Sequence, residues 1–326
     1  MSQNEDPVLT VARLLRTYLR VVKDDGSLAD VQVSQEWCDR ELLKGCDGQV
    51  TVGAERNEER RLSFDGDLRC RFSYVNVNVW CVDKPELDVV GRNMCGKICA
   101  DVCRVIREKR NKPNTVEIDY SGVGGNSETH RAHHMAAISD PTITDSGWTE
   151  LTSSEYEKIW YSDDDRFSRS VLENEKHAYM LFCFKTDADE DVLKQMVLKF
   201  EGYGLAPAGN GVTVMVWHFE SSTWQNAAYG TDESDEVVMV ILTSNLPNYV
   251  NDDGFVYLLV KTTNPSDGAT PAVLYCDYVE VVFTVNGITH ADVASFRDAT
   301  EVRVKPFIWR TEFTIKTWLF ENVPTI

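Results

Sequence analysis

The first third of the chain alternates between helical and strand-like spacing of its apolar positions. Across residues 8–22 apolar side chains recur every three or four positions, which predicts an amphipathic helix. Period-two alternation at 49–53 and at 70–82 predicts strands, and the second run is rich in aromatic and β-branched residues. Pro85 then opens a long apolar stripe that ends in basic residues, the pattern of a second helix, and a short strand is expected at 115–120. This order predicts a small α+β domain, with two helices on a mostly antiparallel sheet.

The middle of the chain has a different rhythm. The Gly- and His-bearing segment 121–134 breaks the helix-and-strand pattern, and we interpret it as a loop at a domain boundary. From Ile138 to about Val285 nearly every apolar segment has strand character and is followed by turn residues. This cadence is typical of an antiparallel, all-β sandwich of the jelly-roll kind. The eight segments are WTELTSS, YEKIWYS, HAYMLFCFKT, VLKQMVLKFEGYG, VTVMVWHFE, EVVMVILTSNL, FVYLLVKTTN and VLYCDYVEVVFTV.

The C-terminal segment returns to the style of the first domain. Its final alternating run, FIWRTEFTIKTWLFENV, is most similar to the strand around residues 72–80. A small sheet with two helices has few ways to cover its apolar face, and a further strand would complete it. We therefore infer that residues 287–326 join 1–139 in one domain and that 140–286 is an insertion. The alternative is three domains in series, with 287–326 as a separate tail.

Charge divides the chain at the same places. The formal net charge is −19, but residues 140–286 carry 25 Asp and Glu against 8 Lys and Arg, whereas the remainder carries 27 against 25. An acidic module thus interrupts a nearly neutral one. Its surface would repel phosphate backbones, which argues against sequence-specific nucleic-acid binding. The simpler interpretation of these charges is that they keep an exposed domain in solution.

Targeting signals and cysteine spacing suggest assembly in a reducing compartment. The N-terminus has acidic residues where a signal peptide needs basic ones, and no apolar run is long enough for a membrane span. The nine cysteines lack the spacing of a disulfide scaffold, so reduced thiols are expected. Cys95, Cys99 and Cys103 recur every four residues, which places them on one face of a helix. Core packing is the favoured interpretation, and ligation of a metal cluster is the alternative.

Candidate chemistry is sparse. His130, His133 and His134 form a histidine cluster, but in a Gly-rich loop we expect them to be solvated rather than to bind metal. The run 163–165 is three aspartates that could ligate calcium, yet without EF-hand spacing it is interpreted as a polar turn. The GVGGN loop lacks a phosphate-binding context, and no nucleophile elbow or zinc-protease helix is present. We therefore expect no cofactor, no metal and no enzymatic activity.

Aromatic residues near turns are the candidates for ligand contact. Sugar rings stack on Trp and Tyr faces while hydrogen bonds set specificity, and Trp148, Trp160, Trp224 and Tyr229 lie close to predicted turns. Packing in the core or at its rim is the alternative for each of them. Trp217 lies in the middle of a predicted strand and is assigned to the core.

Two family resemblances follow from these segments. The run VTVMVWHFESSTWQNA, then ILTSNLPNYVNDDGFVYLLVKTTNPSDG and LYCDYVEVVFTV resemble jelly-roll, carbohydrate-binding-like modules of surface and virion proteins of archaea and their viruses. The first helix, VSQEW…GQVTVG, YVNVNVW, the long second helix and a returning C-terminal strand look like the tail-terminator or tail-completion proteins of tailed viruses. That family has a small α+β fold and caps the tail tube as a ring, usually of six subunits. A 150-residue insertion departs from its usual compact form.

Together the resemblances imply a structural protein of a tailed virus, most plausibly archaeal, at the neck or tail end. A virion protein needs no signal peptide, because it assembles in the host cytoplasm and reaches the exterior by lysis. The resemblances imply that the chain assembles with other copies of itself in a ring, expected to be a hexamer, and that it binds the tail-tube protein and a head–tail connector protein. A surface glycan is a further candidate partner. The alternative is a glycan-binding adhesin or decoration protein, and an enzyme acting on polysaccharide comes last.

Overall fold

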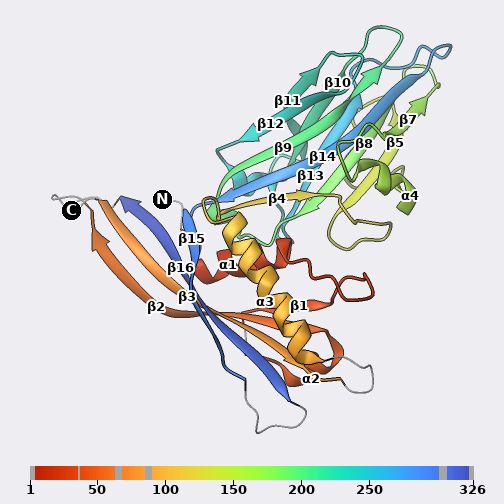
Figure 1. Cartoon of the computed structure of the whole chain (residues 1–326). Helices are drawn as coiled ribbons and strands as arrows, with labels where there is room; N and C mark the ends of the chain where they lie inside the picture. Colours follow the sequence, from red (N-terminus) through yellow and green to blue (C-terminus); the bar gives the residue numbers. More distant parts are fainter. Residues whose placement is uncertain (1–3, 36, 63–67, 85–89, 301–306, 323–326) are drawn as a thin grey trace. The chain divides into compact units, whose positions relative to one another are not determined.

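The computed structural model describes residues 4–35, 37–62, 68–84, 90–300 and 307–322. The chain forms two compact units (Figure 1). The first combines Gln3–Val116 with Asn286–Ile326 and is called the sheet-and-helix unit below. The second, Glu117–Val285, is called the two-sheet unit. It begins at Glu117 and not at residue 140, because the strands that follow residue 115 pair with later strands of the same unit.

The sheet-and-helix unit is built on one five-stranded sheet. Its strand order is β1-β2-β3-β16-β15, with β1 parallel to β2 and every other pair antiparallel. Strand β16 pairs with β3 along its whole length, from Ile308 opposite Val82 to Asn322 opposite Leu68. The predicted return of the C-terminal strand to the first sheet is confirmed by this register. The strands are β1 (Val31–Ser34), β2 (Gly48–Arg61), β3 (Leu68–Val82), β15 (His290–Asp298) and β16 (Ile308–Asn322).

In the described part of this unit three helices accompany the sheet: α1 (Pro7–Tyr18), α2 (Arg40–Gly45) and α3 (Gly91–Glu108). Helix α1 begins where the Asp6 carboxylate accepts the Val8 N–H at 2.8 Å, with Pro7 at the first helical position. Helix α3 packs on β3, β15 and β16 on one face of the sheet (Figure 1). It begins at Gly91, whose N–H donates to the Asp83 carboxylate at 2.8 Å. The predicted start of this helix at Pro85 lies outside the described residues.

Alternation along β3 sets the core of this unit. Val75, Val77 and Val79 are fully buried toward the helices, and the residues between them are half-buried on the opposite face. Helix α1 contributes Val11, Leu14 and Leu15 to this side and also buries an ion pair between Arg13 and Glu5. Thr10 donates a hydrogen bond to the same carboxylate, so the buried charge is satisfied.

The two-sheet unit has antiparallel sheets that face each other across one core. One sheet has the order β11-β10-β13-β8-β5-β6, and the other β12-β9-β14-β4, with β7 also pairing with β14. Inward side chains of both sheets, such as Phe182, Leu258, Leu198 and Val281, belong to a single buried cluster. The chain is therefore mostly β, with several sheets. The strands are β4 (Thr115–Asp119), β5 (Arg131–Ala137), β6 (Thr149–Glu150), β7 (Phe167–Val171), β8 (His177–Lys185), β9 (Leu193–Leu205), β10 (Val212–His218), β11 (Thr223–Gly230), β12 (Glu236–Leu242), β13 (Phe255–Thr262) and β14 (Ala272–Val285).

One of the eight predicted strands is wrong, and another is confirmed only over two residues. The segments WTELTSS and YEKIWYS form the short strand β6, then helix α4 (Ser153–Tyr156) and a 3-10 turn at Glu157–Ile159. A capping box explains the helix. The N–H of Thr152, the residue that precedes the first helical turn, donates to the Glu155 carboxylate at 2.8 Å and so fixes the start of the helix. Elsewhere in the unit, short 3-10 turns occupy Glu190–Val192 and Leu246–Tyr249. Among the described residues no helix is both long and apolar enough to cross a membrane.

Candidate binding surfaces

The six-stranded sheet of the two-sheet unit carries a second, smaller apolar cluster on its outer face. Along β10, Val212, Val214 and Val216 point into the main core, so Met215 and Trp217 point outward. Tyr179, Leu181, Met215 and Leu259 are buried in this outer cluster. Because an outward face is normally polar, burial here requires a cover.

The segment 138–148 provides that cover. Its Asp140 carboxylate accepts a hydrogen bond from the Tyr179 hydroxyl at 2.9 Å and pairs with the Lys261 ammonium group. The Trp224 indole N–H donates to the Pro141 carbonyl at 2.6 Å, and the Trp148 indole N–H donates to the Thr142 carbonyl at 2.9 Å. The Trp224 bond thus ties the segment to β11 of the sheet, whereas the Trp148 bond closes a turn within the segment.

A cleft of about 460 Å³ opens beside Trp148. Phe255 and Tyr257 supply further aromatic surface, and polar groups come from Arg131, His133, Thr144 and Asp145. Ile143, Leu181 and Cys183 complete the lining. Aromatic faces next to hydrogen-bonding side chains are the combination that a sugar ring requires, so this cleft has suitable chemistry for a carbohydrate.

The four predicted contact residues do not all meet there. Trp148 lines the cleft, and Trp224 packs edge-on against Trp217 in the same outer cluster, with ring centroids 4.9 Å apart. Tyr229 is 67% exposed on β11. Trp160 packs against the main core, and its indole N–H donates to the Val123 carbonyl.

Of the residues that line the cleft, sequence reasoning named only Trp148 as a ligand contact, and three of those it missed supply aromatic or charged groups. These are Arg131, Phe255 and Tyr257, and they lie on β5 and β13. Their outward direction could have been read from strand alternation once the inward positions of β13, Val256 and Leu258, had been assigned to the core.

Two of the three clustered histidines belong to a strand, and the third, His130, precedes it and accepts a hydrogen bond from the Lys185 N–H of β8. His133 and His134 lie on β5, where they pair with Leu181 and Met180 of β8. Burial lowers the pKa of His130 to about 4 and lowers the pKa of His133 and His134, so all three are neutral near pH 7. The interpretation as solvated loop residues is wrong, because pairing with β8 draws this segment into the sheet.

An acidic cluster forms near one end of β7. Carboxylate oxygens of Asp164, Asp235 and Asp277 all lie within 4.8 Å of one another. Asp164 belongs to the predicted polar turn, and Asp277 occupies a bulge in β14, where the register with β9 shifts between Cys276 and Tyr278. Burial, followed by the charges of Asp235 and Glu201, raises the pKa of Asp277.

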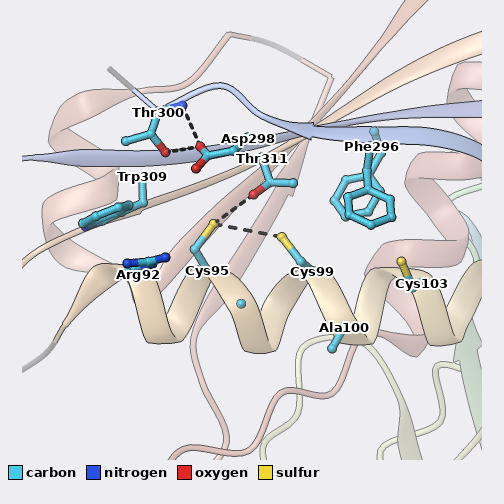
Figure 2. A pocket seen from close by; sticks show the side chains of 12 residues that line it. Arg92, Cys95, Cys99, Ala100, Cys103, Phe296, Asp298, Thr300, Trp309 and Thr311 are labelled. Carbon is cyan, nitrogen blue, oxygen red and sulfur yellow. Dashed lines mark hydrogen bonds between the residues drawn. The ribbon is translucent and has the colours of Figure 1, made fainter. Parts of the chain in front are cut away.

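In the sheet-and-helix unit, a groove of about 380 Å³ lies between α3 and the strands β15 and β16. Figure 2 shows Cys95, Cys99 and Cys103 along one side of α3, as the four-residue spacing predicts. Cys95 is buried, with its sulfur 4.0 Å from that of Cys99 and 3.7 Å from the Thr311 hydroxyl (Figure 2). Core packing therefore holds for Cys95, whereas Cys99 and Cys103 are half-buried and line the groove.

The same sheet has two open edges among the described residues. Strand β1 pairs only with Gly48–Thr51 of β2, so the rest of β2 has β3 on one side and no strand on the other. At the opposite edge β16 is the only described strand that pairs with β15. The Ala291 N–H donates to the Arg110 carbonyl, and further along the strand the Phe296 side chain is 65% exposed beside the groove. Unpaired strand edges are natural sites for pairing with another chain.

Comparison with known proteins adds one match. Residues 127–285 match a family described as an uncharacterized protein, C-terminal domain, and the match lies within the two-sheet unit. A search of curated proteins gives no significant match.

Proposed function

We propose that this protein is a structural component at the neck or tail end of a tailed virus, where the sheet-and-helix unit assembles into a ring. In this proposal the sheet-and-helix unit is the α+β domain of a tail terminator, with α2 as a third, short helix beside the two predicted ones, and the two-sheet unit is an inserted jelly-roll module that projects outward. The ring terminates the tail tube and joins it to the head through a connector protein. The virion would assemble in the host cytoplasm.

One observation supports the ring most directly. The two open edges of the sheet are formed by different strands, and these strands run in opposite directions. Strand β2 is antiparallel to β3, β3 to β16, and β16 to β15, so β2 and β15 are antiparallel to each other. Subunits with one common orientation can therefore pair the β2 edge of one copy with the β15 edge of the next in an antiparallel ladder. Such contacts between unlike surfaces form a ring when the rotation between subunits closes.

Side chains next to these edges support the same contact. Phe296 on β15 would lose its exposure when a neighbouring strand covers that edge. The free part of β2 carries both acidic and basic residues, and β15 carries Asp292, Arg297 and Asp298, so opposite charges are available for cross-strand pairs.

The first test is the native mass of the full-length protein in physiological salt, measured by light scattering after size exclusion. We expect a closed oligomer of about six subunits, with a narrow mass distribution. A monomer at every concentration and salt level, also in the presence of the tail-tube protein, would contradict the ring.

A second candidate function rests on the cleft beside Trp148. Glycan binding, as in an adhesin or decoration protein, is favoured by its three aromatic residues and by Arg131, His133 and Asp145 within one cleft. In this case the sheet-and-helix unit would act as an anchor for the two-sheet unit.

For this candidate we expect that a glycan array finds a ligand and that changing Tyr257 to Ala weakens its binding about tenfold or more. Loss of one stacking aromatic removes on the order of 1–2 kcal/mol of binding free energy. Trp160→Ala serves as the control, because Trp160 packs against the main core away from the cleft lining. Equal losses for both variants would show a stability effect, and no binding to any glycan would reject this function.

A further inference from the structure

The acidic cluster of the two-sheet unit brings together three segments that are far apart in sequence. Asp164 comes from the turn before β7, Asp235 from the segment before β12, and Asp277 from the bulge in β14. Asp277 is only 1% exposed, although an ionised carboxylate strongly prefers water. A buried carboxylate in this position requires compensation by hydrogen bonds or by positive charge.

The compensation provided by the protein is incomplete. Arg166 donates to one oxygen of Asp235, Oδ2, at 2.6 Å and also pairs with Oδ1 of Asp164. Backbone hydrogen bonding from Asp163 and Asp164 only partly offsets the rise in the pKa of Asp277 that burial causes. Even so, Oδ1 of Asp235 and Oδ1 of Asp277 are buried and have no hydrogen-bond partner. Buried oxygens without partners are rare in native proteins, and an unseen ion is one standard reason for them.

Charge and geometry both specify the kind of ion. Three carboxylates against the one Arg166 guanidinium leave two negative charges, which a divalent cation would neutralise. Calcium ligands lie about 2.4 Å from the ion, so two oxygens bound to the same ion are at most about 4.8 Å apart. The three aspartates meet this limit, since their oxygens lie within 4.8 Å of one another. Oxygen-only donors select hard cations such as Ca²⁺, Mg²⁺ or Mn²⁺ over zinc.

We propose that Asp164, Asp235 and Asp277 bind one divalent cation of the calcium type, with water completing its coordination shell. The ion ties the turn before β7 and the segment before β12 to the bulge of β14. Its role is structural, because it joins two loops to a strand within one unit. The proposal does not depend on the neck function.

The test is calorimetric titration of the full-length protein with CaCl₂ after treatment with EDTA, together with its thermal unfolding in each state. We expect one site per chain and a rise of about 5 °C in the melting temperature of the two-sheet unit at saturating Ca²⁺. Mg²⁺ and Mn²⁺ are titrated in parallel to identify the preferred ion.

Three variants make the result specific. Asp277→Asn should weaken Ca²⁺ binding at least 100-fold, and in EDTA it should unfold at the same or a higher temperature than the wild type, because it removes an uncompensated buried charge. Asp164→Asn alters an exposed ligand and should weaken binding about tenfold without changing the EDTA state. Asp252→Asn, in the turn before β13, should change neither. The proposal is overturned if none of the three cations binds, or if Asp277→Asn binds as the wild type does.

Discussion

Two proline variants, one at each open edge of the five-stranded sheet, should fail to assemble alone and should form only dimers when mixed. Leu62 donates its N–H to Leu68 across the β2–β3 hairpin, so strand alternation directs the N–H of Asn57 away from β3. On β15, the N–H of Ala291 donates to the Arg110 carbonyl outside the sheet, so strand alternation also directs the N–H of Val293 away from β16, where it donates to the Asp292 side chain. Proline at either position removes an outward donor and leaves the ladders within the subunit in place.

The mixture should stop at a dimer because each contact joins the β2 edge of one subunit to the β15 edge of another. Asn57→Pro keeps a functional β15 edge and Val293→Pro keeps a functional β2 edge, so a mixture can form one contact and then stops. Native mass spectrometry of the two variants and of their equimolar mixture measures this directly. Asn57→Ala and Val293→Ala are the matched controls and should still form rings. Rings formed by either proline variant alone would exclude edge pairing as the ring contact.

The fold of the sheet-and-helix unit was largely predictable from the sequence. The alternation at 70–82 and in the last strand is strong, because one face of each strand is buried under helices and the other faces outward. Long periodic runs therefore gave both the strands and their pairing. The edge β15 was less evident, because its residues from Ala294 to Asp298 are exposed and carry little alternation.

In the two-sheet unit the errors have local and long-range causes. The helix at Ser153–Tyr156 was missed because Thr152 and Glu155 form a capping box inside a segment rich in β-formers. Strand β5 was missed because its sequence, RAHHMAA, contains few β-formers, and only its pairing between β6 and β8 holds it extended.

The candidate sites depend on contacts that sequence cannot reveal. Trp148 was identifiable as a turn-proximal aromatic residue, but its partner Tyr257 comes from a strand 109 residues later. The aspartate run at 163–165 was visible, yet its isolated spacing indicated only a polar turn. Asp235 and Asp277 give that turn a different chemical character, and both are brought to it by the fold alone.

Acid should destabilise the two-sheet unit selectively, and His130 should account for a large part of the effect. Burial lowers the pKa of His130 to about 4, whereas an unfolded histidine titrates near 6.5. Between these values the unfolded chain binds a proton that the folded chain does not, so the free energy of unfolding falls as pH decreases from about 6.5 to 4. The difference of about 2.5 pKa units corresponds to roughly 3 kcal/mol. His133, His134 and His177, whose pKa values are also lowered, add to this in the same direction.

Urea unfolding at pH steps between 7.5 and 4, with hydrogen exchange of β8 peptides to assign the transition, measures this dependence. The N–H of Lys185 donates to Nδ1 of His130 at 3.2 Å, and the side-chain oxygen of asparagine can accept the same bond. Between pH 7.5 and 4 the free energy of unfolding should therefore fall by up to about 3 kcal/mol less in His130→Asn than in the wild type. This difference does not depend on the stability of the variant at pH 7.5. His290→Asn, in the sheet-and-helix unit, is the control and should leave the slope of this transition unchanged. A His130→Asn slope equal to that of the wild type would show that this histidine takes up its proton in the folded unit as readily as in water.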